Sequence, residues 1–321
     1  MEGRAVEQLQ IGSVGRSVCR IGLGTWSMGG WMWGGADERS ARATIERALE
    51  MGIDLIDTAP VYGFGLSERL VGEVVESLGV RDAVVIATKC GLVWDDRQEP
   101  WRDSSAASIR REVQQSLDRL RTSWIDLYQV HWPDEATPFE ETAAALQDLV
   151  DEGLVKAVGV CNYSAEQMER FARAVRLDAT QFRYNIFERA NEDLREYARR
   201  RGLFAMAYSP LARGLLTGAM RADREPSDPA RRAPMYHGEQ YRRHLAAVEA
   251  LDDLAQRRYG RRVIHLAVRW LLDRPGISAV LWGARKPEQL DQVEGVWGFE
   301  VEEPDFAAID AIVESLADVP S

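Results

Sequence analysis

The sequence predicts an α/β protein, a (β/α)8 TIM barrel with an N-terminal β-hairpin and a long loop after the seventh strand. Short runs rich in Val and Ile alternate with segments of helical period from end to end, which is the pattern of parallel βαβ units. There are eight such runs in 321 residues, a usual number and length for one closed barrel. No G-x-G-x-x-G motif follows the first run, which disfavours an open dinucleotide-binding sheet. We therefore expect one domain over residues 1–321.

The first predicted element is a hairpin over residues 6–18, with Gly12 and Gly15 as turn formers. It precedes the first barrel strand and could close the barrel floor. The predicted strands follow in order at residues 19–24, 53–57, 83–89, 125–131, 155–160, 178–182, 203–208 and 277–282.

Helices are predicted between these strands, because apolar residues recur there at helical spacing. Two such faces are formed by Ala41, Ile45, Ala48 and Leu49, and by Ile109, Val113, Leu117 and Leu120. Residues 209–240 are rich in Pro, Arg, Gly and Asp and predict a long irregular loop, followed by a helix at about 240–258. Loops of this length in compact domains usually have a function or are disordered.

Composition and charge narrow the possible partners. The chain has a net charge of −11 and no run of Lys and Arg, so we expect it to bind neither nucleic acid nor a membrane surface. The N-terminal segment lacks the apolar core of a signal peptide, and we expect a cytoplasmic protein. The three cysteines, Cys19, Cys90 and Cys161, are far apart in the sequence. They predict buried, reduced thiols and no metal site.

Polar residues of catalytic type lie at three successive strand ends. These are Asp57, Lys89 and His131, and Tyr62 follows Asp57 by five residues. Singly they have structural explanations: a helix cap, a surface charge, a core histidine or a packed loop tyrosine. Together they predict a site, because the carboxyl ends of barrel strands converge and buried charges need partners.

This set suits proton donation to a carbonyl oxygen. A phenol is a weak acid at neutral pH, and a nearby ammonium lowers its pKa. Lys89 would supply that charge to Tyr62, Asp57 would hold Lys89, and His131 would orient the carbonyl. Tyr62 would then act as general acid while hydride reaches the carbon. The hydride must come from a cofactor.

The motifs that carry these residues resemble those of the aldo-keto reductases over roughly residues 8 to 315. The matching segments are RIGLGTW (20–26), GIDLIDTAPVYGFGLSERLVG (52–72), VVIATK (84–89), IDLYQVHWPD (125–134), VGVCNYS (158–164), YSPLARGLLTG (208–218) and GARKPEQL (283–290). Within the family, the chain is most similar to the bacterial general-stress and inositol-operon branch.

The resemblance implies a catalytic tetrad at Asp57, Tyr62, Lys89 and His131, and the cofactor NADPH or NADP+. It implies that Asn162 and Gln181 clamp the nicotinamide carboxamide and that Tyr208 stacks on the ring. The remaining implied cofactor contacts are Gly24, Thr25, Trp26, Ser209, Pro210, Leu211, Arg213, Gly283, Arg285 and Gln289. We expect Arg285, with Lys286, to read the 2′-phosphate at the start of a helix that begins with Pro287.

The chain departs from its relatives at Ala219, where the branch carries Lys, and at Gln292 and Val293, where many members carry Glu and Asn. These departures predict that the cofactor is bound more weakly or through different contacts. The tryptophans of the predicted pocket mouth favour an apolar or sugar-like carbonyl substrate; they are Trp26, Trp31, Trp33 and Trp132. We expect a monomer or weak homo-oligomer.

Two other functions are compatible with a barrel. One is a non-catalytic NADPH-binding redox sensor of the same fold, in which Asn usually replaces the histidine that is intact here as His131. The other is a hydrolase that uses Asp57 and Glu68 as an acid–base pair.

Overall fold

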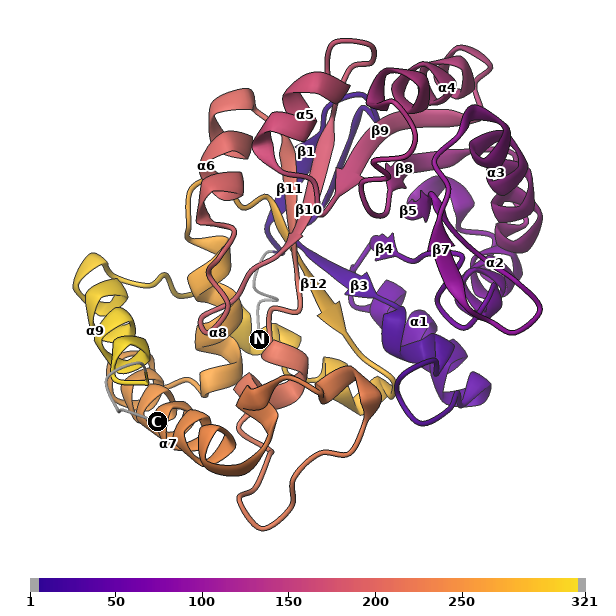
Figure 1. Cartoon of the computed structure of the whole chain (residues 1–321). Helices are drawn as coiled ribbons and strands as arrows, with labels where there is room; N and C mark the ends of the chain where they lie inside the picture. Colours follow the sequence, from indigo (N-terminus) through magenta and orange to yellow (C-terminus); the bar gives the residue numbers. More distant parts are fainter. Residues whose placement is uncertain (1–5, 317–321) are drawn as a thin grey trace.

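Eight parallel strands close into a barrel in the computed structural model, which describes residues 6–316 (Figure 1). In chain order the barrel strands are β3 (Ile21–Gly24), β4 (Leu55–Asp57), β5 (Val85–Cys90), β8 (Ile125–Val130), β9 (Val155–Cys161), β10 (Ala179–Arg183), β11 (Phe204–Tyr208) and β12 (Ala279–Gly283). Each lies within or one residue from a predicted strand. Neighbours in this order pair in parallel, and β12 pairs with β3 to close the barrel. The predicted fold is confirmed.

The predicted hairpin is formed by β1 (Gln8–Ile11) and β2 (Arg16–Cys19), which pair antiparallel. Its apolar side chains Ile11 and Val18 are fully buried and belong to the cluster of side chains that fills the barrel interior. That cluster includes Leu55 and Val85 from the first residues of β4 and β5. The hairpin therefore covers the amino-terminal end of the barrel, and the carboxyl-terminal end is left for the site.

Helices cover the outside of the barrel (Figure 1). They are α1 (Glu38–Glu50), α2 (Leu66–Leu78), α3 (Ala106–Leu120), α4 (Phe139–Asp151), α5 (Ala165–Phe171), α6 (Glu192–Arg201), α7 (Gly238–Tyr259), α8 (Val263–Leu272) and α9 (Glu303–Glu314). Their boundaries follow local chemistry: Asp37 and Ser105 accept hydrogen bonds at the N-termini of α1 and α3, which satisfies amides that lack partners within the helix. Ile109, Val113, Leu117 and Leu120 of α3 are buried, as predicted.

Three features of the loops differ from or extend the prediction. The long loop after β11 is present and contains three short 3-10 helices, η3 (Ala212–Thr217), η4 (Pro229–Arg231) and η5 (Pro234–Tyr236), before α7 begins. An unpredicted hairpin, β6 (Leu92–Trp94) and β7 (Pro100–Arg102), follows β5. The helix predicted to begin at Pro287 does begin there, and it is a four-residue 3-10 helix, η6 (Pro287–Leu290).

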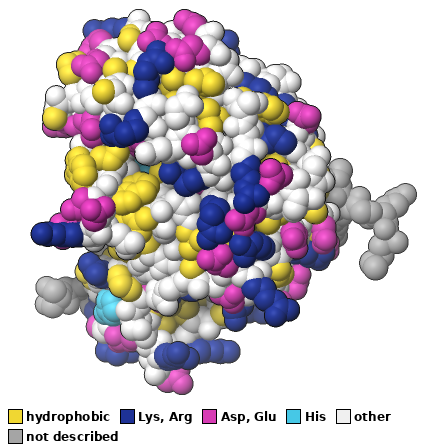
Figure 2. Space-filling model, turned by 90° about the vertical axis from the view of Figure 1, so that its right-hand side faces the viewer, with side chains coloured by type: hydrophobic (Ala, Val, Ile, Leu, Met, Phe, Trp, Pro, Cys, Tyr) yellow, Lys and Arg dark blue, Asp and Glu magenta, His cyan; other side chains and the backbone are white. Residues whose placement is uncertain are grey.

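The face of the molecule in Figure 2 carries basic and acidic side chains interleaved with one another. Ion pairs join α1, α2 and the end of α3, such as Arg42 with Glu73 and Arg121 with Glu76. No helix within residues 6–316 is long and apolar enough to cross a membrane. Cys19, Cys90 and Cys161 are all buried free thiols, as predicted.

Candidate active site

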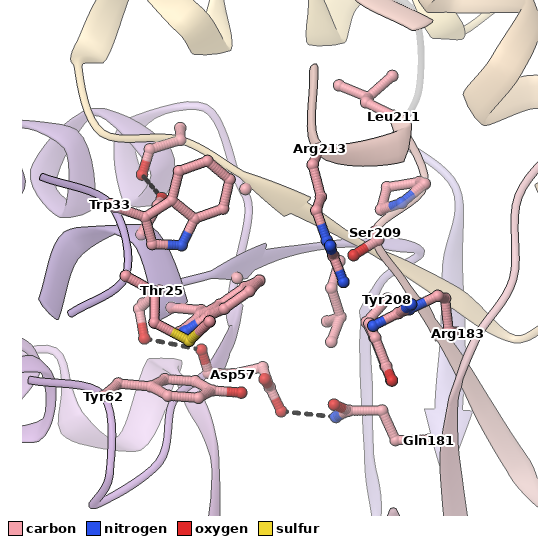
Figure 3. A pocket seen from close by; sticks show the side chains of 18 of the residues that line it. Thr25, Trp33, Asp57, Tyr62, Gln181, Arg183, Tyr208, Ser209, Leu211 and Arg213 are labelled. Atoms are coloured by element: carbon pink, nitrogen blue, oxygen red, sulfur yellow. Dashed lines mark hydrogen bonds between the residues drawn. The ribbon is translucent and has the colours of Figure 1, made fainter. Parts of the chain in front are cut away.

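A pocket of about 560 Å3 opens at the carboxyl ends of the barrel strands. Figure 3 shows it between one wall that carries Thr25, Trp33 and Tyr62 and another that carries Gln181, Tyr208 and Arg213. Thirteen cofactor residues predicted from the sequence besides Asp57 line it: Gly24, Thr25, Trp26, Asn162, Gln181, Tyr208, Ser209, Pro210, Leu211, Arg213, Gly283, Arg285 and Gln289. Asp57, Tyr62, His131 and the four predicted tryptophans also line it. Lys89 is fully buried behind the pocket surface.

Asp57, Lys89 and Tyr62 form one hydrogen-bonded group. The Lys89 ammonium nitrogen lies 2.7 Å from Asp57 Oδ1, 2.8 Å from the Thr58 carbonyl oxygen and 3.4 Å from the Tyr62 hydroxyl. The neighbouring parallel strands β4 and β5 bring the Asp57 carboxylate and the Lys89 ammonium together. The turn after β4 places the Tyr62 phenol beside them. The structure thus brings together three residues that the sequence placed at separate positions.

Burial and charge act in opposite directions on this group. Burial is the largest single effect and disfavours the Lys89 ammonium, but the Asp57 carboxylate, together with Tyr62 and Cys161, raises the pKa of Lys89 above its ordinary value. Burial raises the pKa of the Tyr62 phenol, and Lys89 opposes that rise. The effect of Lys89 on Tyr62 has the predicted sign. The expected net lowering of the pKa of Tyr62 is wrong, because desolvation of the phenolate is the larger effect.

His131 completes the group from the end of β8. Its ring packs edge-to-face against Tyr62, with ring centroids 5.7 Å apart. Burial, and then the nearby Lys89 ammonium, lower the pKa of His131 well below 6.5. The imidazole is therefore neutral at physiological pH, and one ring nitrogen can donate a hydrogen bond to an oxygen in the pocket.

Close backbone contact fixes the position of Tyr62. A Cβ added to Gly29 would lie 2.4 Å from the Tyr62 carbonyl carbon, and one added to Gly63 would lie 2.3 Å from the Gly29 carbonyl oxygen. Gly63 also has a positive φ of 69°. Only glycine fits where two backbones approach this closely. The loops after β3 and β4 therefore pack against each other, and this packing fixes the position of Tyr62.

The side-chain amides predicted to bind the nicotinamide carboxamide, those of Asn162 and Gln181, form hydrogen bonds with other residues of the protein. Asn162 accepts a hydrogen bond from the Tyr208 hydroxyl at 2.9 Å and donates to the His131 carbonyl at 3.1 Å. Gln181 donates to Asp57 Oδ2 at 2.7 Å, and its carbonyl oxygen accepts from Cys161 Sγ at 3.6 Å. The dashed line in Figure 3 marks the contact between Gln181 and Asp57.

The loop after β11 carries unusual backbone conformations at the pocket wall. Ser209, Ala212 and Arg213 have positive φ angles of 57°, 44° and 48°. Such angles cost energy in residues other than glycine and are concentrated at functional sites. They turn the Arg213 side chain toward the pocket, where Figure 3 shows it beside Ser209 and above Tyr208.

Arg183, at the end of β10, lines the pocket and was not predicted from the sequence. Its guanidinium carbon lies 5.6 Å from the Tyr208 ring centroid. The Nε atoms of Arg183 and Arg213 are buried and have no hydrogen-bond partner among the described residues. Two guanidinium groups with unused donors give this part of the pocket a positive potential. A lone arginine within a strand pattern offered no signal for this role.

The loop after β3 and the long loop after β11, which both contribute residues to the pocket lining, are joined to each other. The Ala230 amide donates to the Met32 carbonyl at 3.1 Å, and the Arg231 guanidinium lies 5.0 Å from the Trp33 ring centroid. We call these contacts between Met32–Trp33 and Ala230–Arg231 the loop bridge. Met32, Trp33 and Arg231 of the bridge line the pocket.

Arg285 is attached to the same tryptophan loop. Its Nη1 and Nη2 atoms donate to the carbonyl oxygens of Trp33 and Gly35, each at 3.0 Å. Gln289 accepts hydrogen bonds from the amides of Arg285 and Lys286 at 2.7 and 3.1 Å. Arg285 thus has a structural role in addition to the predicted phosphate contact.

Glu68, from the hydrolase alternative, and the sequence departures Val293 and Ala219 do not line the pocket. Glu68 is fully buried and accepts hydrogen bonds from Thr88 and Arg119, both at 2.6 Å. It does not line the pocket with Asp57, so the structure gives no acid–base pair. Val293 is 3% exposed and packs in the core. Ala219 is exposed in the loop after η3.

The comparisons with known proteins agree with this geometry. A profile described as "Aldo/keto reductase family" matches residues 20–314. The chain belongs to the aldo/keto reductase family. Membership makes it an oxidoreductase that reduces carbonyl groups with a nicotinamide cofactor.

Individual relatives match the chain over nearly its whole length. It is 45% identical over 318 residues to aldo-keto reductase YhdN of Bacillus subtilis, covering 98% of this chain and 96% of the relative. It is 34% identical over 327 residues to the NADH-specific methylglyoxal reductase of Escherichia coli, covering 97% and 99%. A solved structure, the glycerol dehydrogenase AKR11B4 from Gluconobacter oxydans, has a TM-score of 0.90 at 41% identity, covering 100% of this chain and 98% of that one.

Proposed function

We propose that the protein reduces aldehydes or ketones to alcohols with NADPH, with Tyr62 as the general acid. The observation that carries the proposal is the hydrogen-bonded chain Asp57–Lys89–Tyr62 beside His131 at the floor of the pocket. We also propose that the whole chain acts as one domain in the cytoplasm, as a monomer or weak homo-oligomer. Assignment to the general-stress and inositol-operon branch stays a prediction.

The pocket fits a dinucleotide in shape and charge. The Tyr208 ring offers an apolar face to a nicotinamide, and the positively charged guanidinium groups of Arg183 and Arg213, which line the pocket, suit a pyrophosphate. Asn162 and Gln181 would hold the carboxamide after exchanging a hydrogen bond that each makes within the protein. When bound, a reduced nicotinamide supplies a hydride to the carbonyl carbon.

The four catalytic side chains divide the remaining work. His131, neutral through burial, donates a hydrogen bond that positions the carbonyl oxygen. Tyr62 transfers its proton to that oxygen, and the Lys89 ammonium stabilises the phenolate that forms. Asp57 keeps Lys89 charged and directed at the phenol. Because the phenolate is stabilised only as the proton leaves, this interaction favours the transition state over the ground state.

The choice of NADPH rests on Arg285 and Lys286. A guanidinium binds phosphate oxygens through two parallel hydrogen bonds, and Lys286 beside it is exposed. Arg285 now uses one donor of each terminal nitrogen on the tryptophan loop, so three of its five N–H groups are available. The E. coli relative is NADH-specific by name, and titration with both cofactors is therefore a necessary test.

The substrate we propose is a small carbonyl compound with polar neighbours, such as a dicarbonyl or a triose. The names of the E. coli and Gluconobacter relatives support this size and polarity. Trp26, Trp31 and Trp132 on the pocket wall supply flat apolar faces for such a carbon skeleton.

The decisive experiment is Tyr62→Phe with a panel of aldehydes, ketones and keto-sugars. The loss of a general acid should lower kcat by ~10²–10⁴, and the Kd for NADPH should change little because the phenol acts on the substrate oxygen. A variant that reduces the panel at the wild-type rate would refute the mechanism. A wild-type protein that binds NADPH and reduces none of the panel would favour the redox sensor.

A further inference from the structure

Gln129 is a polar residue of β8 in the barrel interior, where the apolar interior cluster meets the polar residues of the site. Its neighbours inside the barrel include Leu127 on the same strand and Ala157 and Ala179 on the next two. Gln129 is fully buried. A buried amide costs free energy unless its hydrogen bonds are satisfied, so its partners indicate why it is there.

Those partners are the catalytic carboxylate and the predicted cofactor clamp. Gln129 Nε2 lies 3.4 Å from Asp57 Oδ2, and Gln129 Oε1 accepts a hydrogen bond from Gln181 Nε2 at 3.4 Å. Within residues 6–316, Gln181 and Gln129 are the side chains that donate to Asp57 Oδ2. Lys89 donates a hydrogen bond to the other carboxylate oxygen, Asp57 Oδ1.

The neighbouring strand is shaped for this side chain. Register places Gln129 opposite Lys89 on β5 and Gly159 on β9. A Cβ on Gly159 would lie 2.9 Å from Gln129 Cγ, closer than side-chain atoms approach in packed interiors. Gly159 therefore leaves the space through which the Gln129 side chain reaches Asp57.

We propose that Gln129 is a positioning residue that holds the Asp57 carboxylate toward Lys89 when Gln181 turns to the cofactor. The inference rests on the proposed function, in which Gln181 binds the nicotinamide carboxamide. Gln181 cannot direct the same amide hydrogen at Asp57 and at a ligand. Gln129 has no access to the pocket surface, so its donor stays on Asp57 Oδ2 throughout turnover.

Two substitutions test the role. Gln129→Leu removes the donor, and it should lower the rate of hydride transfer in single turnovers by about tenfold, because a hydrogen bond to a charged group is lost. Gln129→Glu keeps the size of the side chain. Protonated at acid pH, its carboxyl group can still donate to Asp57. Ionised at alkaline pH, it repels Asp57.

The pH profile distinguishes positioning from structural support. The Gln129→Glu variant should approach the wild-type rate at acid pH and fall progressively below it as pH rises. The Gln129→Leu variant should be slow throughout. The Kd for NADPH, measured by quenching of tryptophan fluorescence, should stay within about twofold of wild type in both. Thr180→Val is the matched control, since Thr180 is 1% exposed on the outward face of β10 and its hydroxyl has no partner among the described residues.

Several outcomes would overturn the inference. Wild-type rates in both Gln129 variants would do so while leaving the proposed function intact. A loss of rate that is equal at all pH values in both variants, with lower melting temperatures, would show a purely structural role. If Gln129→Leu fails to fold, the Gln129→Glu variant alone tests the inference: a rate relative to wild type that does not fall as pH rises would overturn it. A wild-type protein that does not reduce carbonyls with NADPH would overturn the proposed function and this inference together.

Discussion

Glu112 in α3 should make the stability of the protein depend on pH, and Gln in its place should remove that dependence. The carboxyl group is 3% exposed and lies behind β5. It accepts hydrogen bonds from the Gly91 amide at 3.1 and 3.2 Å and from the Ser108 hydroxyl at 3.2 Å. Burial outweighs these contacts and raises the pKa of Glu112 from 4.5 to about 7.

The size of this stability change follows from the difference between the pKa of Glu112 in the folded state and in the unfolded state. Below pH 4.5 the group is protonated in both states, and its full contribution to stability is present. As pH rises toward 7 the unfolded chain ionises first, so the folded state loses stability. At about 1.4 kcal/mol for each pH unit, the interval from 4.5 to about 7 corresponds to about 3 kcal/mol.

Urea unfolding of the wild type and of Glu112→Gln between pH 4 and pH 9 measures this difference. The glutamine copies the protonated acid in shape, so the two free energies of unfolding should be similar near pH 4. The variant should become more stable by about 3 kcal/mol by pH 8. Because all other groups titrate alike in both proteins, a difference that stays constant with pH would refute the reasoning.

The remaining predictions concern the pocket. Lys89→Met should abolish reduction and shift the pH profile of any residual activity upward, because Tyr62 loses the charge that lowers its pKa; melting curves recorded alongside separate this from simple destabilisation. Arg285→Ala should raise the Kd for NADPH more than tenfold, or at least ~1.4 kcal/mol, and leave that for NADH nearly unchanged in calorimetric titrations, whereas equal weakening would mean that Arg285 serves only the tryptophan loop. Gly29→Ala should displace Tyr62 and cost about 1–3 kcal/mol of stability, with a lower melting temperature and lower kcat; retention of both would show that the contact with Tyr62 is loose.

The barrel and the position of its site could be predicted because both follow from local patterns. Alternation of buried strands with amphipathic helices indicates the parallel barrel, and its carboxyl ends collect Asp57, Lys89 and His131 in space. Residue types at strand ends are visible in a sequence. The hairpin of β6 and β7 was missed because the segment 92–102 combines acidic residues and Pro100 with little alternation.

Other properties depend on contacts between distant segments and could not be predicted. The net pKa of Tyr62 is set by how deeply the folded chain buries it, and charge spacing alone suggested the opposite direction. The second role of Arg285 arises because the loop after β3 passes within hydrogen-bond distance of the end of β12. Arg183 enters the pocket because β10 extends two residues beyond Gln181.

The loop bridge has a consequence for the kinetics of cofactor exchange. The contacts of Met32 with Ala230 and of Trp33 with Arg231 join two loops beside the pocket that a dinucleotide would occupy. These contacts amount to one backbone hydrogen bond and one cation–π interaction, each about 1 kcal/mol. Because these contacts must break before a dinucleotide can enter or leave, we expect the bridge to slow both steps by a similar factor. The Kd for the dinucleotide should then be nearly unchanged. We therefore expect substitutions that break the bridge, such as Arg231→Ala, to shorten the residence time of a dinucleotide bound in the pocket.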